Sequence, residues 1–179
     1  RVRVRGDFRT SGGTGTFSMT SPSTELEVLG NAIIAGGSTQ GRLTAGTLQL
    51  SGNLQQIAVC TDAQLRQQLV MTGTYTTVFK GNAQSVQFGC ATDQGSQLNQ
   101  VIVNAGTTVN LMTDVLVFGQ TLIEGNVTSR ASLVTGGTVT GRGAIASRLL
   151  WVHGELMPGF GSYVVEQTLF TGPSQPIHG

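Results

Sequence analysis

The sequence predicts an all-β fold, a single-stranded parallel β-helix (β-solenoid), with an irregular insertion that has room for a short helix. The first observation is a period of six, because every sixth residue between 103 and 151 is hydrophobic at eight of nine positions. The second is a composition rich in glycine and threonine and poor in charge. The eight hydrophobic residues of this hexad repeat are Val103, Val109, Val115, Val127, Leu133, Val139, Ile145 and Trp151.

A period of six fits a chain that coils, since an α-helix repeats every 3.6 residues and a strand every two. Each hexad is expected to form one short strand and one corner, with the hydrophobic side chain pointing into a shared core. Glycine stands two positions before several members of the repeat, where the backbone must bend: Gly119, Gly125, Gly137 and Gly143. The repeat therefore predicts a buried column of aliphatic side chains.

The composition agrees with a solenoid. Glycine contributes 26 of 179 residues, about twice the ~7% of an average protein, and 24 residues are threonine, which favours strands. Charged residues make up 11%, against ~25% in a typical globular domain. A net charge of +1 without a basic stripe argues against nucleic acid as a partner. No stretch approaches the ~20 apolar residues that a membrane span requires.

We expect one solenoid domain over residues 1–179. Residues 1–25 are expected to be irregular around a starting edge strand, in which arginine and valine alternate from Arg1 to Arg5. Residues 26–54 repeat the hexad in weaker form and are predicted to be coils. Residues 55–100 break the period and are predicted to be an insertion. Residues 101–157 are the hexad coils. The proline-containing segment 158–179 is expected to be an irregular tail with one apolar strand around 163–165.

Within the insertion, Thr61 or Asp62 could cap a short helix that carries Leu65 and Leu69 on one face. Strands are expected at 75–79 and 85–88, separated by a turn at 80–82.

The two cysteines, Cys60 and Cys90, both lie in the insertion. A disulfide between them is favoured over two buried thiols, and it would stabilise the fold by about 3 kcal/mol in the chain-entropy model. Such a bond indicates an oxidising, extracellular setting. The spacing leaves both alternatives open.

No motif for catalysis, metal or cofactor binding stands out. The only histidines, His153 and His178, have no ligand-spaced companions. Four carboxylates could in principle supply the pair that a glycoside hydrolase needs, but they are scattered along the chain: Asp114, Glu124, Glu155 and Glu166. We therefore expect no enzyme and no cofactor.

Three segments carry a resemblance to a known class of protein. They read TVFKGNAQSV at 77–86, LNQVIVN at 98–104 and VNLMTDV at 109–115. Over about residues 43–157 the chain resembles the β-solenoid repeat domains, adhesin-like or immunoglobulin-like, of secreted bacterial surface proteins. A more local similarity joins GTVTG at 137–141 and WVHGEL at 151–156 to bactofilins, the polymer-forming β-helices of the bacterial cytoskeleton.

The resemblance implies a structural role, a non-catalytic building block of an extracellular bacterial appendage, filament or sheath. Its expected partners are copies of itself, stacked end to end, and surface glycans. Two alternatives remain: a β-helix that binds or cleaves polysaccharide, and a cytoplasmic bactofilin-like polymer. The oxidation state of Cys60 and Cys90 would distinguish the extracellular role from the cytoplasmic one.

Overall fold

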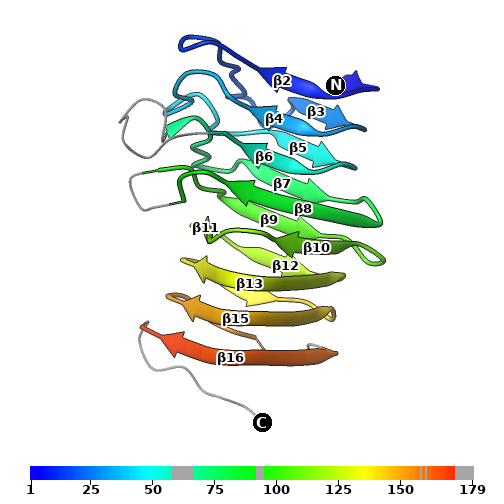
Figure 1. Cartoon of the computed structure of the whole chain (residues 1–179), viewed down its shortest axis with the longest axis vertical. Helices are drawn as coiled ribbons and strands as arrows, with labels where there is room; N and C mark the ends of the chain where they lie inside the picture. The colour runs from blue at the N-terminus through cyan, green and yellow to red at the C-terminus, as the bar shows by residue number, and fades with distance from the viewer. Residues whose placement is uncertain (58–66, 92–94, 158, 160, 172–179) are drawn as a thin grey trace.

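The computed structural model describes residues 1–57, 67–91, 95–157, 159 and 161–171. They form a parallel β-solenoid of about seven turns, and every named strand pairs in parallel with its neighbours (Figure 1). The described part contains no helix. Most of the helix expected to carry Leu65 and Leu69 falls on residues 58–66, outside the described residues, and Leu69 itself lies buried in a turn.

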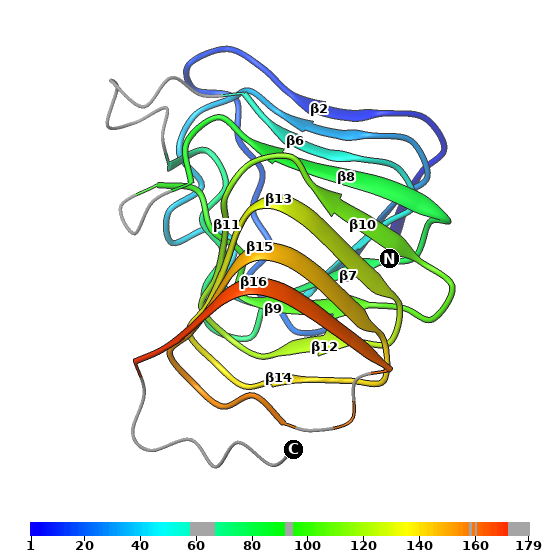
Figure 2. The ribbon, with the colours of Figure 1, turned by 60° about the horizontal axis from the view of Figure 1, so that its bottom comes forward.

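Two sheets and a third, shorter wall surround the core (Figure 2). The first wall contains β1 (Val2–Val4), β3 (Glu25–Val28), β5 (Thr47–Leu50), β7 (Thr76–Phe79), β9 (Gln100–Val103), β12 (Thr121–Ile123) and β14 (Val139–Thr140). The second wall contains β2 (Phe8–Thr10), β4 (Ala32–Ile34), β6 (Leu54–Gln56), β8 (Ala83–Phe88), β10 (Thr108–Leu111), β13 (Asn126–Thr135), β15 (Ala144–Val152) and β16 (Ser162–Phe170).

The third wall consists of β11 (Val115–Val117) and the final residues of the long strands β13, β15 and β16. These strands bend from the second wall around the corner into the third (Figure 2). Single parallel bridges continue the wall upward, joining Met19 to Leu43, Leu43 to Met71 and Leu98 to Val117.

Three hexads make one coil, and each hexad contributes one strand to one of the three walls. On the second wall Val109 pairs with Val127 and Val127 with Ile145, so positions three hexads apart lie one above another. On the first wall Thr121 pairs with Val139 at the same interval. The hexad residues from Val103 to Ile145 are all buried, which confirms the predicted column.

Trp151 departs from the column, so its expected place in the core is wrong. The pairing of β13 with β15 shifts between Ser129 and Ser132, and Leu133 then pairs with Leu150 instead of Trp151. The coil is one residue shorter at this corner, and a one-residue shift turns a strand residue to the opposite face. Leu150 and Val152 are buried in its place, while Trp151 is half-buried on the outside.

The upper coils are longer and uneven. Leu26 pairs with Leu48, and Leu48 pairs with Thr77, so both coils exceed three hexads and the second is longer than the first. Extra residues enter at the corners and hide the period of six. The segment 55–100, expected to interrupt the solenoid, in fact contributes β7 and β8 to its walls.

The two ends also differ from the expected irregular segments. Strands β1 and β2 already belong to the first coil, because they pair with β3 and β4. Within 158–179, strand β16 pairs along the length of β15. The sequence indicated only the apolar start of this strand, around 163–165, because the residues that follow are mostly exposed and show no apolar alternation.

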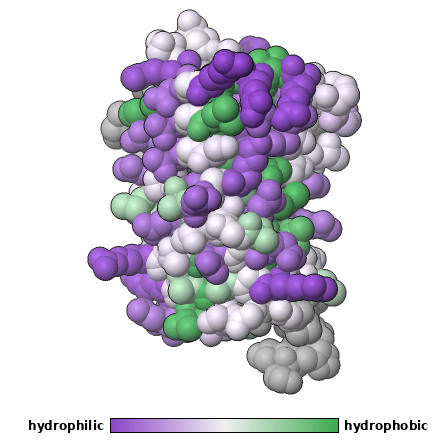
Figure 3. All heavy atoms as spheres, turned by 90° about the vertical axis from the view of Figure 1, so that its right-hand side faces the viewer, coloured by the Kyte–Doolittle hydropathy of each residue, from purple (hydrophilic) through white to green (hydrophobic). Residues whose placement is uncertain are grey.

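Two features fix the corner between the first and second walls. A Cβ atom on Gly143 would collide with the backbone oxygen of Gly125 in the coil above, so the small residue is required by space. Higher up, the side-chain oxygens of Asp7, Asn31 and Asn53 accept the backbone N–H groups of Asn31, Asn53 and Ser85 at 2.7, 3.0 and 2.8 Å. Figure 3 shows the molecule from the side of this corner, where hydrophobic residues are scattered among hydrophilic ones.

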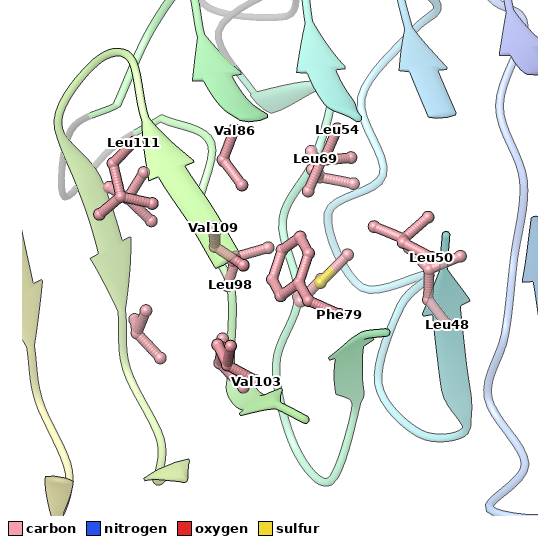
Figure 4. Packing of buried hydrophobic residues seen from close by; sticks show 14 of the residues in the cluster. Leu48, Leu50, Leu54, Leu69, Phe79, Val86, Leu98, Val103, Val109 and Leu111 are labelled. Atoms are coloured by element: carbon pink, nitrogen blue, oxygen red, sulfur yellow. The ribbon is translucent and has the colours of Figure 1, made fainter. Parts of the chain in front are cut away.

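The core is filled with large side chains in the upper coils and with valine in the lower ones. Phe79, Leu69 and Leu98 point toward one another from different parts of the coil (Figure 4). Below them a small cavity of about 20 Å³ is lined by hydrophobic side chains and by Thr121. The Thr121 hydroxyl is buried and has no hydrogen-bond partner among the described residues. A buried water needs two to four polar partners, and this lining offers one.

Replacing Thr121 by valine should therefore stabilise the protein. The change keeps the shape of the side chain and removes an unsatisfied hydroxyl, whose desolvation costs roughly 1–3 kcal/mol. Urea denaturation measures the gain. Thr77→Val is the matched control, because Thr77 lies in the same column but its hydroxyl is 3.2 Å from Met71 Sδ. An equal gain in both variants would contradict the argument.

Candidate functional site

A solenoid offers its side walls and its two ends as functional surfaces. Among the described residues no group of three or more histidine, cysteine or acidic side chains could hold a metal ion. In the same residues, no helix is long and apolar enough to cross a membrane. The candidate sites are therefore two grooves, one ionic cluster and the exposed ends.

A groove of about 570 Å³ runs along the third wall, and we call it the Trp151 groove. Its floor is set by register: Leu116 pairs with Val134 and Val134 with Trp151, so three outward side chains lie one above another. Phe118 is 46% exposed beside them. The lining is mostly apolar, and its polar side chains are Asp114 and His153.

Hydrogen bonds hold the polar edge of the Trp151 groove in place. The Trp151 and His153 rings are stacked, with centroids 5.0 Å apart and planes at 26°. Trp151 Nε1 donates to Thr171 Oγ1 at 3.1 Å, and the same hydroxyl lies 2.7 Å from His153 Nδ1. Asp114, the other polar residue of the lining, accepts the backbone N–H of Ser132 through its Oδ1 at 2.7 Å.

A second groove of about 360 Å³ lies at the bend between the second and third walls. Arg130 and Arg148, one coil apart in sequence, line it together with Glu166. We call it the arginine groove. It is the more polar of the two, and it faces outward from β13, β15 and β16.

The four carboxylates considered for glycoside hydrolysis are not gathered in either groove. Asp114 lines the Trp151 groove alone, and Glu166 lines the arginine groove alone. Glu124 follows β12, and Glu155 precedes the bridge between Leu156 and Val139.

An ionic cluster covers the outer face of the first wall near its upper end. Glu27 is 2% exposed although it points outward, because it lies beneath three cations. Its carboxylate is 2.5 Å from Lys80 Nζ, 2.7 Å from an Arg1 nitrogen and 3.0 Å from Arg3 Nε. The hydrogen bonds from Lys80 and Arg1 lower the pKa of Glu27 to about 2.

The sequence signalled a strand at Arg1–Arg5 but not the partner of its arginines. Arg3 lies beside Glu27 because β1 pairs with β3, and these two residues face each other in that pairing. A search for opposite charges one coil apart would have found the pair. The Trp151 groove had no such signal, because it depends on the register shift in β13.

Of the two cysteines, Cys90 lies among the described residues. Cys90 is buried, and its backbone N–H donates to Gln56 Oε1 at 3.2 Å. Cys60 lies outside the described residues, so the Cys60–Cys90 disulfide stays a prediction.

The low pKa of Glu27 predicts a dependence of stability on pH. Its pKa falls from 4.5 to about 2 on folding, so its ionised form contributes stability above pH ~4.5 that is lost as the pH falls through about 2. The free energy of unfolding, measured with urea, should therefore decline across this window. Glu27→Gln should be less stable at neutral pH and lose less on acidification.

The matched control is Glu166→Gln, since Glu166 is exposed and makes no ion pair with the described residues. It should behave as the unaltered protein in both conditions. Equal acid sensitivity in the Glu27→Gln variant and the unaltered chain would contradict the assignment.

Comparison with known proteins identifies no relative: no family model, curated protein or solved structure matches the chain. The resemblance to surface-protein repeat domains and to bactofilins therefore remains an expectation from the sequence. What is shown is the fold, a parallel β-solenoid of about seven turns.

Proposed function

We propose that the protein is a non-catalytic structural subunit of an extracellular bacterial appendage, filament or sheath, and that it acts by end-to-end self-association. The observation that carries the proposal is the last coil. Strand β16 continues the walls of the solenoid, but its residues are largely exposed. Its outer backbone edge has no strand partner among the described residues. A free edge of this kind is a template for a further strand.

Apolar side chains at this end continue the columns of the core. Tyr163 lies below Ile145, and Phe170 lies below Val152, both of which are fully buried. Tyr163 is 40% exposed, whereas Ile145 above it has no exposed surface. Burying this layer against another molecule would be favourable, because apolar area removed from water contributes about 25 cal/mol per Å².

The upper end offers a similar layer. Val2 and Val4 lie above the buried Leu26 and Val28, and Val2 is 59% exposed. β2 is the uppermost strand of the second wall, and β16 is the lowest strand of the same wall (Figure 1). Phe8 packs against Phe17 at this end, with ring centroids 5.1 Å apart. Low net charge leaves little long-range repulsion to oppose stacking.

The catalytic and cytoplasmic alternatives are less well supported. A polysaccharide-cleaving enzyme needs two carboxylates across one site, and the described residues contribute a single carboxylate to each groove. A cytoplasmic bactofilin-like polymer would share the stacking but would keep its cysteines reduced.

Self-association is tested by sedimentation velocity at rising concentration, with negative-stain imaging of the same samples. The unaltered protein should form larger species as its concentration increases. Tyr163→Lys should abolish this growth, because it places a charge in the end layer. Val164→Lys is the control, since Val164 is the next residue and points outward. A monomer at every concentration would overturn the proposal.

The oxidation state of the two cysteines tests whether the protein is extracellular. Intact mass with thiol labelling, before and after reduction, should show two thiols only after reduction, because Cys60 and Cys90 are expected to be paired. Labelling of both without a reductant would remove the support for secretion and favour the bactofilin-like alternative.

A further inference from the structure

We propose that the Trp151 groove binds an uncharged saccharide, with a pyranose ring packed against Trp151 and His153. This inference does not depend on self-association. The groove lies on the third wall and the stacking surfaces lie at the ends, so either proposal can fail alone.

The apolar part of the groove suits the C–H face of a sugar ring. A pyranose ring presents a face of C–H groups that packs on flat aromatic side chains, with hydroxyls around its rim. Trp151 and His153 form a stacked pair, and Phe118 is exposed nearby. In a small domain with few aromatic residues, three such rings on one groove are a concentrated binding surface.

The pair is held ready for a ligand. Trp151 Nε1 can only donate, and its bond to Thr171 fixes the orientation of the indole. The same threonine engages His153 Nδ1, which orients the imidazole and leaves Nε2 as its second polar atom. Side chains positioned before binding lose less entropy when a ligand arrives.

Asp114 supplies an acceptor for sugar hydroxyls. One of its oxygens accepts the backbone N–H of Ser132, which anchors the carboxylate at the edge of the groove. The other oxygen makes no hydrogen bond with the described residues. A few polar groups at the margin of an apolar pocket, in a volume within ~300–1,000 Å³, are typical of small-ligand sites.

Charge narrows the class of sugar. Among the described residues, neither lysine nor arginine lines the Trp151 groove, and its one formally charged side chain at neutral pH is Asp114. Uronic and sialic acids would meet a carboxylate without a cation to pair with it. The arginine groove, with Arg130 and Arg148, offers the opposite charge on another part of the surface.

The chain carries its own reporter, because Trp151 is its only tryptophan. Intrinsic fluorescence is therefore measured during titration with cellotetraose, chitotetraose and mannotetraose as uncharged probes and tetragalacturonate as the acidic one. We expect a saturable change with at least one uncharged probe and none with tetragalacturonate. Affinity is confirmed by calorimetry, which does not depend on the fluorophore.

Variants separate the contributions. Trp151→Leu and Phe118→Ala should each weaken binding by about tenfold or more in calorimetry, as expected for loss of an aromatic contact. Asp114→Asn should weaken it less, because an amide oxygen still accepts a hydrogen bond. Arg148→Gln, in the arginine groove, is the control and should bind as the unaltered protein does. Circular dichroism verifies that each variant is folded.

Three results would overturn the proposal. The first is no response to any uncharged probe at millimolar concentration. The second is an equal response to tetragalacturonate, which would contradict the charge argument. The third is a change in fluorescence when the protein concentration is raised without any sugar, if Phe118→Ala abolishes this change and Tyr163→Lys does not. A second copy of the chain would then occupy the groove.

Discussion

The structure depends on one constraint, the alignment of inward side chains from coil to coil. Parallel strands pair residue by residue, and alternate residues face opposite sides, so each coil must place its apolar residues above those of the next. A coil of three hexads satisfies this with one hexad for each wall. The core, the walls and the exposed surfaces all follow from keeping that alignment through about seven turns.

Where the alignment changes, the surface changes with it. Strand β15 turns the corner with one residue fewer than β13, which places Trp151 outward and leaves Leu150 and Val152 to fill the core. The shift keeps the core aliphatic, because Leu150 and Val152 take the inward positions that Trp151 and His153 would occupy without it. The same shift places an indole beside Val134 and creates the apolar groove. One register step thus links the packing of the interior to a candidate binding surface.

The lower coils could be predicted from the sequence, and the upper coils could not. From Val103 to Ile145 the corners are short and equal, so the hydrophobic period survives. Above them, the coils differ in length at their corners, and no fixed spacing connects Leu48 to Thr77. Ion pairs between coils could not be predicted either. Glu27 contacts Lys80 because the first wall places distant segments of the chain side by side, and no local motif indicates this contact. The Trp151 groove could not be predicted, because it depends on the register shift and the spacing of hydrophobic residues does not reveal that shift.

The position of the Trp151 groove on a side wall has a consequence for an assembled filament. Seven coils rise by roughly 34 Å at about 4.8 Å per coil, so stacked subunits would repeat the groove at that axial interval. Each groove would stay open, because stacking covers ends and not walls. A long polymer could then bind through many weak contacts at once, and avidity would exceed the affinity of a single groove by orders of magnitude. Polymer length would set the strength of adhesion.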